Sequence, residues 1–108
     1  MPQENVTTLP LTNRQAELLL REFAKDSRRL VNTIQYGAEE VWFEMVSYNQ
    51  ALLCLKEGRV IGRPEVDEHG NHVCVAHRVC GGLDVFVTFA IEPANEKRIF
   101  ILNVENTQ

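Results

Sequence analysis

Two valine- and phenylalanine-rich runs on either side of a glycine pair, Gly81-Gly82, constrain the fold of this chain more than any other feature. β-Branched and aromatic residues fit a pleated, half-buried surface, and glycine supplies the positive φ that a tight reversal needs. The stretch from Val73 to Ile91 is therefore predicted to form a β-hairpin at the centre of a sheet. Its register decides which side chains face the core, because a slip of one residue exchanges the two faces of a strand.

Two registers are compatible with the glycine pair. In the first, the two glycines form a two-residue turn and Cys80 pairs with Leu83, which mixes valines with polar residues on one face. In the second, Gly82 is left-handed in a three-residue loop and Val79 pairs with Leu83. The second register gathers the apolar side chains onto one face, so it is the register predicted here.

In the second register the outward face of the hairpin carries His72, Arg78 and Asp84, with Arg78 directly opposite Asp84. These are the candidate catalytic residues, because an imidazole can carry a proton and a guanidinium can stabilise a phosphate. The alternative is an ordinary cross-strand ion pair on a solvated face, worth about 1 kcal/mol at most. Candidate binding residues come from the same face, from the strand before the hairpin and from the first helix: Phe86, Thr88, Arg63, Arg28 and Arg29.

The last two arginines belong to a basic group near the end of the first helix. Such a group is either a solvated helix face or a patch for phosphate or an acidic partner. A second cluster, of three histidines and two cysteines, falls within residues 69–80. Strand alternation turns His77 away from the others, and no paired-ligand knuckle is present, so no metal and no cofactor are predicted. His77 is predicted to be a core histidine among valines.

Helices are predicted to precede the sheet. Thr12 and Gln15 match a capping box, and apolar residues at helical spacing continue the pattern, which predicts an additional helix over residues 12–35. Lys25-Asp26-Ser27 weakens the pattern, so the helix either continues through it or restarts at Ser27. A second helical pattern follows Gly37, and a third ends near Gly58. Residues 1–11 are expected to be flexible within a single domain spanning residues 1–108.

Strands are predicted over Arg59–Val66, His72–Val79, Leu83–Ile91 and Arg98–Val104. The predicted fold is therefore α+β, with two or three N-terminal helices packed on one face of an antiparallel sheet of about four strands.

The charge of the chain argues against a nucleic-acid role. Its net charge is −4, and residues 1–58 carry 6 basic and 8 acidic side chains. Nucleic-acid affinity depends on clustered Lys and Arg that neutralise phosphates, and the chain lacks such a field. Three cysteines and no export signal favour a reduced, cytoplasmic protein, and no run approaches the roughly 20 apolar residues of a membrane span.

A series of short motifs runs from Tyr36 to Val104: Gly37-Ala38, Phe43-Glu44-Met45, Val46-Ser47, Ala51-Leu52, Glu57-Gly58-Arg59-Val60-Ile61, Gly70, Gly81-Gly82-Leu83-Asp84-Val85 and Ile99–Val104. With these motifs the chain resembles the domain-of-unknown-function family 4258, which is similar to the BrnT and RelE/ParE toxins. The resemblance implies a RelE-like fold over residues 36–105, with residues 12–35 as an additional helix. It also implies an activity, since such toxins are commonly ribonucleases or gyrase poisons neutralised by a small antitoxin.

The chain departs from that family pattern at two places. Gly37-Ala38 stands where the family often has His-Ala, and Glu44-Met45 stands where an arginine often precedes the methionine. These losses favour a non-catalytic protein-interaction module of toxin–antitoxin-like ancestry, whose partner is an antitoxin-like protein or a second copy in a homodimer. The alternative is a RelE/BrnT-like endoribonuclease that acts on RNA through the open sheet face. Whether the chain is an enzyme stays open at this point.

Overall fold

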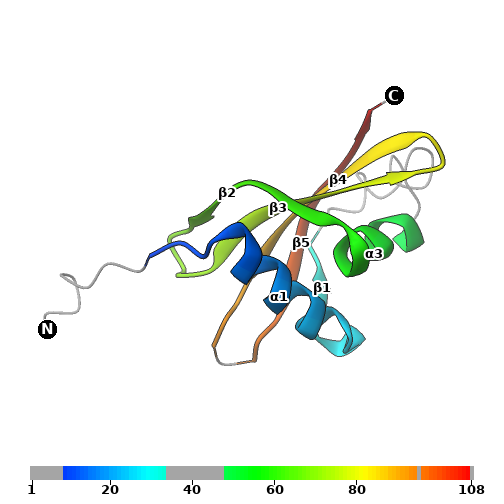
Figure 1. Cartoon of the computed structure of the whole chain (residues 1–108). Helices are drawn as coiled ribbons and strands as arrows, with labels where there is room; N and C mark the ends of the chain where they lie inside the picture. Colours follow the sequence, from blue (N-terminus) through cyan, green and yellow to red (C-terminus); the bar gives the residue numbers. More distant parts are fainter. Residues whose placement is uncertain (1–8, 34–47, 95, 108) are drawn as a thin grey trace, which may run out of the picture.

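The computed structural model describes residues 9–33, 48–94 and 96–107. These residues form an α+β fold in which two α-helices lie against a five-stranded mixed sheet (Figure 1). The elements in chain order are α1 (Asn13–Ala24), the 3₁₀ turn η2 (Ser27–Arg29), β1 (Leu30–Asn32), α3 (Tyr48–Glu57), β2 (Arg59–Val66), β3 (His72–Cys80), β4 (Leu83–Ile91) and β5 (Ile99–Thr107).

The strand order is β1-β5-β4-β3-β2. Strands β2 to β5 are an antiparallel meander, as predicted, whereas β1 adds a fifth strand parallel to β5. The prediction of an α+β fold is confirmed, and that of a purely antiparallel sheet is wrong. The helix predicted after Gly37 lies outside the described residues.

Helix α1 begins where the sequence predicted and ends earlier. The Thr12 side chain accepts a hydrogen bond from the Gln15 backbone N–H, and the Gln15 side chain accepts one from the Thr12 backbone N–H. The capping box is therefore confirmed. Asp26 then caps η2 by accepting from the Arg28 backbone N–H, which ends the helical path. The prediction of a helix over residues 12–35 is wrong beyond Ala24, because Leu30–Asn32 pairs with β5 instead.

Helix α1 also covers the outer edge of β2. The Glu17 carboxylate accepts a hydrogen bond from the Val60 N–H at 3.1 Å, and the Asn13 amide donates to the carbonyl oxygens of Val60 and Gly62. These side chains take the place of a neighbouring strand. Pro64 and the irregular register between Ile61 and Glu65 interrupt the edge further on. Such devices prevent an edge strand from pairing with another chain.

The core lies between the helices and one face of the sheet. Figure 1 shows α1 and α3 on the same side of the strands. On β3 the buried hydrophobic side chains are small: Cys74, Ala76 and Cys80. On β4 and β5 they are larger, and the buried set there includes Val85, Val87, Phe89, Ile91, Ile99 and Ile101. The core is therefore built by β4 and β5, with β3 providing room for the helices.

The hairpin adopts the first of the two registers considered above, and the predicted second register is wrong. Cys80 pairs with Leu83, so Gly81-Gly82 is a two-residue turn. Both glycines have positive φ, 57° and 85°, as a type I′ turn requires. The predicted three-residue loop is wrong, and with it the assignment of every side chain of β3 to a face of the sheet.

Candidate interaction face

The face of the sheet turned away from α1 and α3 is called the open face here. Strand register assigns to it alternate residues of four strands: Arg59, Ile61 and the exposed Glu65 of β2, Val73, Val75, His77 and Val79 of β3, Asp84, Phe86, Thr88 and Ala90 of β4, and Phe100, Asn103 and Glu105 of β5. Most of these side chains are partly or largely exposed, whereas on β3 and β4 many of the residues between them are buried in the core. The valines of β3 were predicted to face the helix-covered core, and they lie on the open face instead.

His72 lies on the opposite face, under the helix side. Its side chain is only 4 % exposed, and its Nδ1 lies 3.4 Å from the Leu11 backbone N–H, which donates to it. Burial lowers its pKa, an effect that the nearby Asp67 carboxylate partly offsets. The prediction that His72 stands on an outward face is wrong, because the one-residue difference in register moves it into the core.

Arg78 lies on the helix side as well. Its guanidinium donates to Cys80 Sγ at 3.1 Å and to a carboxylate oxygen of Glu57, at the end of α3, at 3.0 Å. These bonds, with the Cys80 contact first, raise the pKa of Arg78. Arg78 pairs across the hairpin with Val85, not with Asp84. The structure therefore does not bring His72, Arg78 and Asp84 together as predicted.

A different histidine meets Asp84 on the open face. His77 Nε2 lies 2.7 Å from Asp84 Oδ1, and its ring centroid lies 4.8 Å from that of Phe86. The two polar side chains are partly exposed. The prediction of His77 as a core residue is wrong. With a two-residue turn, His77 pairs with Phe86, and Asp84 lies diagonally across from His77 on the same face. Choosing that turn would have predicted the group of His77, Asp84 and Phe86 from the sequence.

Apolar side chains make up much of the rest of the open face. Ile61 is 38 % exposed and Val79 is 58 % exposed. Leu102, the extra residue at the register shift between β4 and β5, is 40 % exposed and lines the end of this face beside Ala90 and Phe100. Val73, Val75 and Phe100 are half-buried beside them, and Thr88 lies in the row of Val75. Phe86 and Thr88 are thus on the open face, as predicted. An exposed apolar patch on a sheet marks an interaction surface more often than a scattered single residue does.

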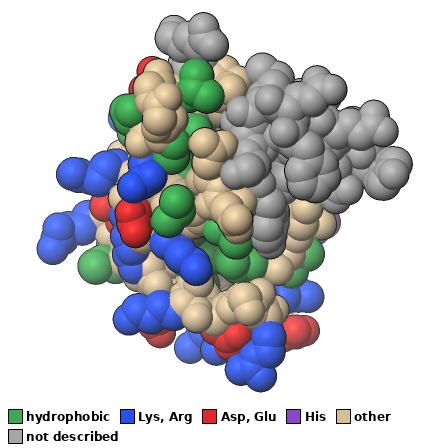
Figure 2. All heavy atoms as spheres, turned by 90° about the vertical axis from the view of Figure 1, so that its right-hand side faces the viewer, with side chains coloured by type: hydrophobic (Ala, Val, Ile, Leu, Met, Phe, Trp, Pro, Cys, Tyr) green, Lys and Arg blue, Asp and Glu red, His purple; other side chains and the backbone are tan. Residues whose placement is uncertain are grey.

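The row of paired residues Arg59, His77, Phe86 and Glu105 crosses the open face from β2 to β5, and its two ends carry opposite charges. Arg59, on β2, has a side chain 80 % exposed and lies 3.7 Å from Glu17 of α1. Glu105, on β5, is exposed and accepts a hydrogen bond from Asn103. Figure 2 shows Lys and Arg side chains mixed with Asp and Glu over the left and lower parts of another side of the molecule. A single basic field of the kind that holds nucleic acid is not visible there.

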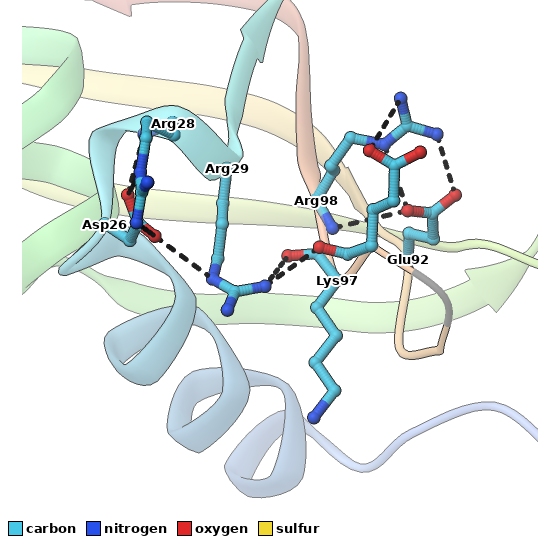
Figure 3. A network of polar contacts seen from close by, with 7 residues as sticks. Asp26, Arg28, Arg29, Glu92, Lys97 and Arg98 are labelled. Carbon is cyan, nitrogen blue, oxygen red and sulfur yellow. Dashed lines mark hydrogen bonds and ion pairs between the residues drawn. The ribbon is translucent and has the colours of Figure 1, made fainter.

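Arg28 and Arg29 belong to a polar network at one end of the sheet (Figure 3). Arg28 makes two side-chain bonds to Asp26, which lower the pKa of that carboxyl. Arg29 donates to the Glu96 carbonyl oxygen at 2.9 Å, which ties η2 to the β4–β5 loop. Both arginines thus lie away from the open face, in a structural network. Arg63 is exposed in the irregular part of β2.

A cavity of about 440 Å³ opens at the end of the open face near that network. Ala90, Phe100 and Leu102 contribute apolar lining. Arg98 and Glu92 contribute a polar wall, and their two parallel bonds of 3.1 Å lower the pKa of Glu92. Because each of these charged groups already has a partner, the cavity offers apolar contact more than an anion site.

In the described part of the chain, no group of three or more His, Cys, Asp or Glu side chains is arranged to hold a metal ion. No described helix combines the length and apolar character needed to cross a membrane. Comparisons with protein-family models, curated proteins and solved structures found no match to this chain. The fold and the open face therefore define the class, an α+β protein with one sheet face free of helices among the described residues.

Proposed function

We propose that this chain is a protein-interaction module that binds another protein through the open face and catalyses no reaction. The observation that carries the proposal is that β3 is largely apolar on both faces, with Val73, Val75 and Val79 on the open face, where β4 adds Phe86 and Ala90. Strands that are apolar on both faces are typical of sheets covered on both sides. Helices α1 and α3 cover one face, and a protein surface docked on the other would provide the second layer.

The open face also defines the chemistry of its partner. Its centre includes Val75 and Thr88, while Arg59 and Glu105 lie at opposite margins. A complementary surface therefore has an apolar centre, an acidic group at one margin and a basic group at the other. The resemblance of residues 36–104 to toxin-like families adds a proposal about ancestry, in which the module descends from a toxin bound by a small antitoxin.

The test compares substitutions on the open face with a matched one elsewhere. Ile61→Lys and Leu102→Lys place a charge on the open face, whereas Leu53→Lys does so on α3, where Leu53 is 39 % exposed. Each variant, with unfolding temperature checked, is used as bait in an extract of the host and examined by sedimentation. The proposal expects associations that the wild type and Leu53→Lys share and that both open-face variants lose. A wild-type chain without any association, or one unaffected by these variants, would overturn it.

An endoribonuclease acting through the same face is a second candidate, favoured by the His77–Asp84 contact. A carboxylate that holds one imidazole nitrogen leaves the other available for proton transfer to or from RNA. Purified protein would be incubated with total RNA and with translating ribosomes, alongside His77→Ala and Asp84→Asn. Cleavage by the wild type that both variants lose would establish this function, and equal cleavage by all three would remove it.

A further inference from the structure

One row of side chains crosses the open face from edge to edge. Arg59 pairs with His77, His77 with Phe86, and Phe86 with Glu105, so the row has a cation on β2 and an anion on β5. The charges of the row are therefore complementary to those of an identical row that runs in the opposite direction. A surface that carries the same row in the opposite order would meet each charge with its opposite.

We propose that the partner of the open face is a second copy of this chain, packed face to face about a two-fold axis that lies between the two sheets and runs parallel to the strands. The inference rests on the proposed function, because it names the partner of the same face. Such a rotation sets β2 over the partner's β5 and β3 over the partner's β4. Arg59 then faces the partner's Glu105, and the symmetry makes this contact twice.

The centre of the face is compatible with this arrangement. Val75 and Thr88 are neighbours in the next row, so the rotation sets Val75 over the partner's Thr88. Both are compact β-branched residues, which allows two sheets to approach to the usual distance of about 10 Å. A long arginine and a glutamate can bridge a gap of that size at the margins. The apolar contacts then lie at the middle of the interface and the ion pairs at its rim.

The size of the face sets the expected affinity. Four strands spaced about 4.8 Å apart and about nine residues long cover roughly 570 Å². Two copies would bury roughly 1,100 Å² in total, just above the threshold of about 1,000 Å² for a specific interface. Each copy also carries a net charge of −4, which opposes association at long range. An interface at this lower size limit is typical of weak association, so a dimer that dissociates on dilution is expected.

Sedimentation velocity of the full chain over a concentration series tests the inference by charge exchange. Arg59→Glu and Glu105→Arg each create two like-charged contacts, and each should weaken the dimer at least about tenfold. The double variant restores opposite charges in reversed order and should dimerise at least about tenfold more tightly than Arg59→Glu alone. Recovery stays short of the wild-type value because the carboxylate introduced at position 59 lies beside Glu17 of the same chain. Lys25→Glu, at the end of α1, makes the same charge change as Arg59→Glu away from the face and should have little effect.

Two results would overturn the inference: a wild-type chain that stays monomeric, or a double variant that dimerises no better than the single variants. The outcome is separable from that of the proposed function. A monomeric wild type that binds another protein, with Ile61→Lys abolishing the binding, would remove the second copy as partner and leave the proposed function standing. A wild-type chain that associates with nothing would remove both.

Discussion

Replacing Gly58 with alanine tests the close packing of α3 on β3. Gly58 follows the last residue of α3 and precedes β2. A Cβ at this position would lie 2.5 Å from the Cys54 carbonyl oxygen and 2.7 Å from that of His77. Both are backbone atoms, one on α3 and one on β3, so neither can move aside as a side chain would. Ordinary contact begins at 3.4 Å, which requires the two elements to separate.

The expected cost follows from that separation. Overpacking that shifts backbone costs about 1–3 kcal/mol, and contacts below 3.0 Å with two backbone atoms place Gly58→Ala at the upper end of that range. Alanine recovers about 0.4–1 kcal/mol of this by restricting the unfolded chain. A net loss of about 2 kcal/mol lowers the unfolding temperature by roughly 8–15 °C in a domain of this size. The Arg21 guanidinium, which donates to the carbonyl oxygens of Leu55 and Gly58, adds to the loss if the helix end moves.

Thermal unfolding monitored by circular dichroism measures the effect, with Gly70→Ala as the control. Gly70 has a φ of 82° and no atom within 4 Å of an added Cβ. Alanine there costs only the left-handed backbone penalty, about 1–2 kcal/mol before the unfolded-state gain. Gly58→Ala should therefore unfold at a clearly lower temperature than Gly70→Ala. An unfolding temperature equal to that of the wild type would refute the close approach of α3 and β3.

Three further predictions concern buried and edge groups. Because burial lowers the pKa of His72, the folded state binds its proton less readily than the unfolded state, so stability is full above the ordinary value of 6.5 and is lost as the pH falls through and below it; urea unfolding between neutral pH and about pH 5 should show a smaller loss for His72→Gln. Glu17→Ala should lower the free energy of unfolding by about 1–2 kcal/mol because the Val60 N–H loses its acceptor, whereas Glu17→Gln should stay within about 0.5 kcal/mol. Burial raises the thiol pKa of Cys54 and of Cys74 to about 12, so iodoacetamide followed by mass spectrometry should label both only after unfolding.

Local signals in the sequence predicted the start of α1, the end of α3 and the strands that follow. The capping box of Thr12 and Gln15 fixed the start of α1, and the glycine after Glu57 marked the end of α3. The four strands of the meander after Gly58 follow alternation and turn chemistry, which act over a few residues. β1 was missed because Leu30–Asn32 has little strand character of its own. Its conformation depends on pairing with β5, nearly seventy residues away.

The hairpin register was missed for a different reason. Choosing the face with the larger apolar side chains assumes that the core takes the largest residues. In this fold α3 approaches β3 so closely that the strand buries small residues, Cys74 and Ala76, and turns its valines outward. That approach is a tertiary property, which the hydrophobic pattern of one strand does not reveal. The predicted site was wrong for the same reason, because His72 is buried on the helix side and His77 lies on the open face.

The two candidate functions compete for the same residues. In the face-to-face dimer His77 lies opposite the partner's Phe86, and RNA has no access to the imidazole. A ribonuclease working through His77 would therefore be active as a monomer, and its cleavage rate per chain should fall as protein concentration rises through the dissociation constant. An interaction module shows association without cleavage at any concentration. Measuring cleavage and sedimentation over one concentration series thus separates the two, and a rate per chain that stays constant while the dimer forms would contradict a shared face.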